Sequence, residues 1–108
     1  MAFIPKALAD GQLPTAQDIL FTGTADIATY VKTFTLFNNN ASNQIILIGV
    51  NQSGTVRNWR RFELLLNESA DVIDDGESMI LEQGDTIVGS TTSANAVDFT
   101  ISGVEEFG

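Results

Sequence analysis

Apolar and polar residues alternate in short runs along most of the chain, starting near Ile19. The clearest alternation is close to the C-terminus, where Val97, Phe99 and Ile101 are separated by polar residues. A period of two buries one face of an extended strand and leaves the other face in water. The runs predict β-strands at residues 19–22, 28–37, 44–50, 57–66, 78–82, 86–91 and 96–105.

The segments between these runs are short and carry Gly, Asn, Asp or Ser, which favour turns. Many short strands at this spacing are typical of a sandwich or barrel. The chain has no visible internal repeat and no sign of a second domain. The sequence therefore predicts an all-β, single-domain antiparallel β-sandwich over residues 19–108, of jelly-roll or immunoglobulin-like type.

Residues 1–18 have a different character. Isolated apolar residues are mixed with Pro5, Gly11 and Pro14, and neither a helical nor a strand period is sustained. This pattern predicts an extended N-terminal arm. A short helical turn over residues 5–10 is an alternative, since proline is tolerated at a helix start.

Two runs depart from simple alternation. Residues 45–48 are all apolar, so both faces of that strand require a cover. A neighbouring subunit could supply the second cover, and so could a loop or the N-terminal arm. In residues 33–37 the period changes near the end, which indicates either a β-bulge or a strand apolar on both faces.

Composition narrows the possible functions. The 108 residues include no Cys and no His, which removes disulfides, catalytic thiols, the commonest general base and the commonest transition-metal ligand. A net charge of −9 would repel a phosphate backbone, so nucleic acid is not expected as a partner. No apolar segment is long enough to span a membrane or to serve as a signal peptide, so no membrane partner and a cytoplasmic origin are expected.

The densest acidic stretch, residues 68–77, is the only candidate for a metal site. Its carboxylates do not follow the spacing of a twelve-residue calcium loop, and a solvated turn at Asp74-Asp75-Gly76 is the favoured interpretation. A catalytic pair of carboxylates would need a pocket and two matched roles. We therefore predict no catalytic residue, no metal ligand, no cofactor and no enzymatic activity.

Residues 57–62 hold three of the five cations, Arg57, Arg60 and Arg61, beside the single tryptophan, Trp59. Arginine and tryptophan are frequent at the energetic centres of protein interfaces. Together with Ile46 and Ile48 of the doubly apolar run, these four residues form the predicted subunit interface. Pairing within the chain, with Trp59 in or beside the core, is the alternative.

Several segments resemble a family of small virion structural proteins of tailed bacteriophages. In the C-terminal half these are residues 73–78, 81–87, 94–97 and 100–105, and upstream the segment 30–38 also matches, so the resemblance spans about residues 21–106. It implies a β-sandwich without a catalytic site. It also implies a place in the virion, after assembly in the bacterial host cytoplasm, as a head decoration protein or a tail or neck component.

On this resemblance we expect a capsid decoration, or cement, protein that binds the outer shell and bridges capsomers. Its partners would be the major capsid protein and further copies of itself, with a trimer expected by analogy. The arm would contact the shell or a neighbouring subunit through Phe3, Ile4, Pro5, Leu8 and Leu13. A ring-forming tail or neck subunit and a receptor-binding module are the alternatives.

Overall fold

The computed structural model describes residues 2–23, 27–40, 42–52, 54–73, 79–93 and 95–107, and the side chains of residues 2–6, 27 and 107 are not described. These residues form strands and connections. The strands are β1 (Ala2–Gln12), β2 (Asp18–Thr22), β3 (Ile27–Asn38), β4 (Gln44–Gln52), β5 (Thr55–Leu64), β6 (Ser69–Asp71), β7 (Met79–Leu81), β8 (Thr86–Thr91) and β9 (Val97–Phe107). In the described part of the chain no helix has the length and apolar character needed to cross a membrane.

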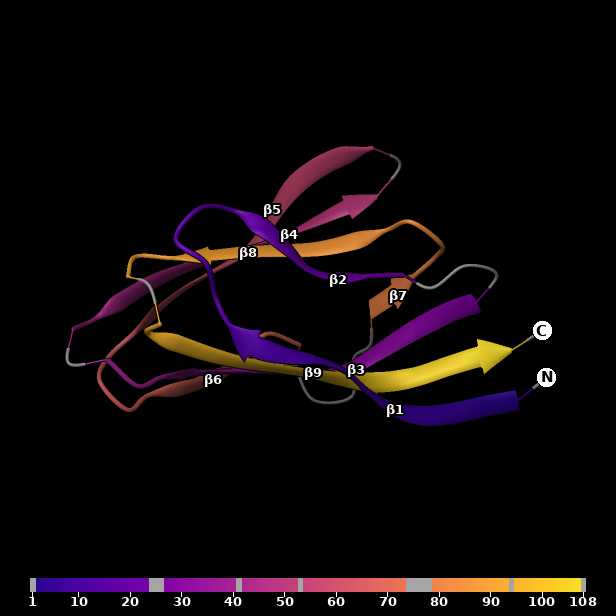
Figure 1. Cartoon of the computed structure of the whole chain (residues 1–108), viewed down its shortest axis with the longest axis horizontal. Coiled ribbons are helices and arrows are strands. Elements are labelled where there is room, and N and C mark those ends of the chain that lie inside the picture. The colour runs from indigo at the N-terminus through magenta and orange to yellow at the C-terminus, as the bar shows by residue number, and fades with distance from the viewer. Residues whose placement is uncertain are drawn as a thin grey trace.

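The strands form two antiparallel sheets packed face to face, which confirms the predicted β-sandwich (Figure 1). One sheet has the order β1-β9-β3-β6, with β7 also paired to β3, and the other has the order β2-β8-β4-β5. The pairs are nested along the chain: first strand with last, second with second-last, and so on inward to β4 and β5. This interleaved order is that of a jelly roll and differs from an immunoglobulin-like sandwich.

Strand β1 occupies the segment predicted to be an arm. Its residues are extended, but they pair with β9 along their whole length, from Ala2 opposite Phe107 to Gln12 opposite Asp98. The helical alternative at residues 5–10 is wrong, because those residues are part of the same strand. This strand could not be predicted from the sequence for two reasons. Pro5 is unfavourable in a strand, and a register shift between Ala7 and Ala9 interrupts the alternation of apolar and polar residues.

Strand β3 shows why the period of its sequence changes. A β-bulge lies between Val31 and Thr33, so Lys32 and Thr33 are both exposed while Val31 and Phe34 are both buried. After the bulge the strand alternates regularly, and Phe37 lies on its outer face. The bulge is therefore present, but it precedes residues 33–37, and Phe37 is the one apolar residue that this run places on the outer face.

The core lies between the two sheets. Strands β3 and β9 supply much of it, and the rings of Phe34 and Phe99 pack at a tilt of 56° with their centroids 6.4 Å apart. This is a favourable aromatic arrangement. The other buried apolar residues come from both sheets and from the segments between strands: Leu13, Val31, Leu36, Ile46, Ile48, Leu64, Val72, Ile73, Leu81, Ile87, Ala96, Val97 and Ile101.

Strand β4 is the doubly apolar strand, and it lies inside its sheet between β8 and β5. Ile46 and Ile48 point into the core and have no exposed surface, whereas Ile45 is 44% exposed on the opposite face. The N-terminal segment does not cover that face, since β1 belongs to the other sheet. The placement of Ile46 and Ile48 at a subunit interface is therefore corrected, because both pack in the protein's own core.

Buried amides hold the connection between β3 and β4. The Nδ2 group of Asn38 donates to the carbonyl oxygens of Ser42 and Leu64, both at 3.0 Å, and of Leu65, at 3.2 Å. The Oε1 atom of Gln44 accepts from the Thr91 hydroxyl at 3.1 Å and from the Ser93 amide at 2.9 Å. The two buried amide side chains thus find hydrogen-bond partners among the backbone and hydroxyl groups of neighbouring segments.

Candidate interaction site

The hairpin of β4 and β5 is the part of the sandwich that projects furthest from the opposite sheet (Figure 1). Gln52 pairs with Thr55, so a two-residue connection joins the strands. Its second residue, Gly54, has a φ of 87°, in a region where residues with a Cβ are strained. The hairpin therefore carries β5 out to the edge of its sheet.

Strand β5 is an edge strand ten residues long. Within the described parts of the chain its ladder partner is β4, and no backbone hydrogen bond reaches β5 from its other side. Such a strand presents a row of free N–H and C=O groups to its surroundings.

A β-bulge divides β5 and turns its arginines to different faces. Ile48 pairs with Arg60, and the next residue of β4, Gly49, pairs with Asn58, so Trp59 is the extra residue. Directly opposed residues share a face of the sheet. Arg60 therefore lies on the inner face beside Ile48, while Arg61, opposite Leu47, lies on the outer face.

A pocket of about 450 Å³ lies between the outer half of this hairpin and the other sheet. Two strands supply most of its lining: Val50 and Gln52 from β4, and Thr55, Arg57, Asn58 and Trp59 from β5. Met79 of β7 closes it from the opposite sheet. The pocket thus combines an apolar floor with amide, hydroxyl and guanidinium groups, a mixture common in binding sites.

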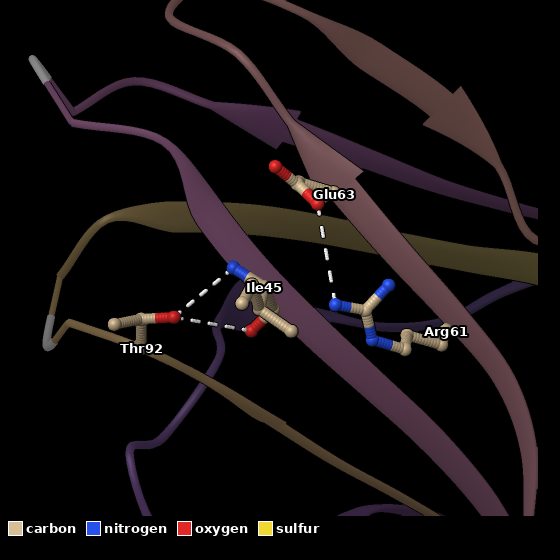
Figure 2. A network of polar contacts seen from close by, with 4 residues as sticks. All are labelled: Ile45, Arg61, Glu63 and Thr92. Atoms are coloured by element: carbon tan, nitrogen blue, oxygen red, sulfur yellow. Dashed lines mark hydrogen bonds and ion pairs between the residues drawn. The ribbon is translucent and has the colours of Figure 1, made fainter.

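The three arginines of β5 have different surroundings. The guanidinium carbon of Arg60 lies 4.9 Å from the centre of the Trp59 ring, a cation–π distance, and Trp59 as a whole is 37% exposed. Arg61 forms an exposed ion pair with Glu63 at 4.0 Å (Figure 2). Arg57 lines the pocket and, within the described residues, forms neither a hydrogen bond nor an ion pair.

The outer face of the same sheet carries exposed apolar residues. Figure 2 shows Ile45 beside the Arg61–Glu63 pair, with its backbone held by Thr92. The Ile45 amide donates to the Thr92 hydroxyl at 3.0 Å, and that hydroxyl lies 3.4 Å from the Ile45 carbonyl oxygen. Thr92 thus fixes the backbone at the start of β4 but leaves the Ile45 side chain exposed.

The acidic stretch, residues 68–77, was considered as a calcium site and as a solvated turn. Asp74, Asp75 and Glu77, on which both interpretations depend, lie outside the described residues. Over the described residues, no group of three or more potential ligands is placed to hold a metal ion.

One carboxylate outside the acidic stretch has a clear electrostatic effect. The Tyr30 hydroxyl donates to Oε2 of Glu106 at 2.7 Å. This hydrogen bond, partial burial and the nearby negative charge all raise the pKa of Tyr30 above its ordinary value of 10.0.

The sequence-predicted interface residues are partly brought together. Arg57, Trp59 and Arg60 lie around one pocket or beside it, and Arg61 lies on the opposite face of the same strand. Pairing within the chain, the alternative interpretation, holds for Arg61 and for the contact of Arg60 with Trp59. Val50, Gln52 and Met79 were missed, since no local pattern marks residues that meet only after the sheets pack.

The residues of the N-terminal segment that were predicted to contact a shell or a neighbouring subunit differ in their burial. Leu13 is buried in the core, and Leu8 is half-buried against it. The side chains of Phe3, Ile4 and Pro5 lie outside the described residues, although their backbones pair with β9. Leu13 is thus corrected from a contact residue to a core residue.

The chain matches no protein-family profile, and no curated protein sequence matches it.

Proposed function

We propose that this protein is a non-enzymatic structural subunit of a tailed-bacteriophage virion that acts by binding other protein subunits. In its more specific form it is a capsid decoration protein on the outer shell. The observation that carries the proposal is the exposed edge strand β5, with Arg57, Trp59 and Arg61 accessible on a protein whose net charge is −9.

Two further features support it. The segments that resemble tailed-phage virion proteins span most of the sandwich, from about residue 21 to residue 106. The jelly-roll order is one that capsid proteins of viruses use. Because one fold serves many functions, the contact surface carries more weight than the topology.

Binding to a shell would rely on repetition. A single contact at the β5 edge is small, but several copies in one symmetric assembly multiply it through avidity. Under this proposal the major capsid protein is the partner, and a homo-oligomer, a trimer by analogy, sits over capsomer junctions. Bridging then uses the projecting hairpin, because β1 is paired within the sheet and is not a free arm.

A receptor-binding module is the second candidate, and the pocket favours it. Trp59 offers a ring face, while Gln52, Asn58 and Arg57 offer hydrogen-bond donors around it. Aromatic rings flanked by amides suit a sugar. Titration of the isolated protein with oligosaccharides of the host surface, followed by Trp59 fluorescence, tests this candidate, and saturable binding would favour it over decoration.

The experiment that tests the main proposal is cryo-electron microscopy of the purified virion, combined with the mass of the isolated protein in solution. We expect density for the sandwich on the outer shell at capsomer junctions. Density confined to the tail or neck would replace decoration with the ring-forming alternative, and isolated rings without a shell would point the same way. Absence from the particle would overturn the virion assignment.

A further inference from the structure

We propose that the β5 edge and the adjoining pocket bind an acidic protein segment in extended conformation, which adds to the sheet as a further strand beside β5. This inference deepens the proposed function, on which it rests, by naming the chemistry of the partner. The contact would combine main-chain hydrogen bonds along β5 with a carboxylate on Arg57.

The first argument comes from a comparison of the edge strands. β1 carries Pro5, which has no N–H, and Lys6, and such residues discourage strand addition. Both β2 and β5 have a register shift, but β2 is only five residues long, and β6 and β7 have three residues each. β5 is ten residues long and contains neither proline nor lysine. It is therefore the edge best suited to pair with another chain.

Charge decides what that chain can be. Arg57, Arg60 and Arg61 place three of the protein's five cations within five residues, against one acidic residue in the strand, Glu63. Opposed like charges destabilise a strand pair, so β5 of a second copy is a poor partner. Opposite charges stabilise the pair, so an acidic strand is favoured.

Geometry adds a site for one carboxylate. Arg57 lies opposite Val50 and lines the pocket, without an ion pair or hydrogen bond in the described part of the chain. A strand added beside β5 would direct alternate side chains toward this face. A glutamate there reaches the Arg57 guanidinium, which can bind a carboxylate through two parallel hydrogen bonds. Beside it, Trp59 and Met79 offer apolar surface to the stem of the same side chain.

The other two arginines contribute less. Arg61 already has Glu63 as a partner on the outer face, and Arg60 packs over Trp59. Both still add positive potential along the strand and favour encounter with an acidic segment. Replacement of Arg57 is thus expected to weaken binding of an acidic segment more than replacement of Arg60 or Arg61.

The test uses the isolated full-length protein and a blocked ten-residue peptide of alternating Glu and Thr, matched in length to β5. The single tryptophan, Trp59, reports binding by fluorescence, and amide chemical shifts show which strand responds. We expect saturable binding that weakens with salt, with shifts concentrated on β5. A peptide with Lys in place of Glu should not bind.

Two controls separate the parts of the proposal. R57E should weaken binding by roughly tenfold or more, whereas K32E, which makes the same charge change at an exposed site on β3, should alter it less than about twofold. The same peptide with an N-methyl group on every backbone nitrogen keeps its charge but cannot pair as a strand through either of its edges. It should lose most of its binding.

Three outcomes would overturn the inference. If the N-methylated peptide binds as tightly as the unmodified one, binding does not involve strand addition. If the lysine peptide binds as tightly, binding does not depend on the charge of the peptide. Self-association that R57E abolishes makes a second copy the occupant. The peptide experiment needs no virion. Peptide binding can therefore be found even if the protein is absent from the capsid shell, and the protein can lie on the shell even if the peptide does not bind. The two proposals are thus tested separately.

Discussion

The side chain of Asn38 joins three segments at one end of the sandwich. Its amide donates to the carbonyl oxygens of Ser42, Leu64 and Leu65, and no exposed surface remains on the residue. Asparagine is therefore required there, because no other residue of similar size supplies two side-chain N–H donors.

N38D tests this requirement with almost no change in shape. A carboxylate would face three carbonyl oxygens without a donor, so we expect a loss of about 3 kcal/mol in the free energy of unfolding at pH 7. The loss should shrink at low pH, where a protonated carboxyl can donate. Chemical denaturation measures it, and N43D, at an exposed residue, is the matched control. Equal effects of the two substitutions would contradict the assigned role.

Tyr30 makes the pH dependence of one contact measurable. Its pKa is raised first by the hydrogen bond to Glu106, then by partial burial, and then by the Glu106 charge. Since folding raises this pKa, the contact stabilises the protein below the ordinary tyrosine pKa of about 10, and this stabilisation is lost as the pH rises through the folded-state value.

Ultraviolet absorbance should show this ionisation directly, because Tyr30 is the only tyrosine. We expect the midpoint above 10.0, and we expect E106Q to lower it. A midpoint unchanged by E106Q would mean that the hydrogen bond does not form in solution.

At the scale of the strand, β3 provides a matched pair of aromatic residues. Phe34 has no exposed surface and packs on Phe99, whereas Phe37, three residues later, is 40% exposed on the other face. Removing a buried phenylalanine forfeits its burial and leaves a cavity.

F34A should therefore lower the free energy of unfolding by about 4 kcal/mol, and F37A by less than about 1.5 kcal/mol. Urea denaturation of both variants gives the comparison. Similar losses would place the bulge of β3 elsewhere, since its position decides which phenylalanine faces the core.

Strands with a regular period could be predicted from the sequence, and those without one could not. Val97, Phe99 and Ile101 alternate over a buried face, so β9 was predicted from the pattern alone. β6, Ser69–Asp71, has one apolar residue and forms only because β3 lies beside it. β1 was missed for a similar reason, since its pairing with β9 outweighs the weak strand preference of its own residues.

The candidate site divides in the same way. Arg57, Trp59, Arg60 and Arg61 are close in the sequence, so their cluster was visible before the structure. The pocket was not, because Met79 reaches it from the other sheet. Ile46 and Ile48 could not be told from Ile45 by composition, since only the pairing of β4 decides which residues of an apolar run face the core.

At the scale of the whole molecule, the nested pairing makes β1 part of the sandwich. β9 lies between β1 and β3, and Leu8 and Ala9 of β1 pack against the core. Deletion of residues 2–12 would expose the β9 edge and part of that core.

We expect this deletion to destabilise the protein by more than about 3 kcal/mol and to promote aggregation through the new edge. Thermal unfolding with light scattering follows both effects. Replacement of Thr15 and Gln17 by alanine, in the exposed connection after β1, should change little. An unaltered midpoint after the deletion would restore the interpretation of this segment as a separate arm.

The pairing of the first strand with the last also determines how the protein bears load. Ala2 lies opposite Phe107, so both ends of the chain leave the sandwich at the same place (Figure 1). A force that pulls the two ends apart acts across the β1–β9 ladder and opens its hydrogen bonds one pair after another, like a zipper. A force applied between the β5 edge and the termini instead acts on the two packed sheets together. We therefore expect the sandwich to resist less force when it is pulled between its first and last strands than when it is pulled between its hairpin and those strands.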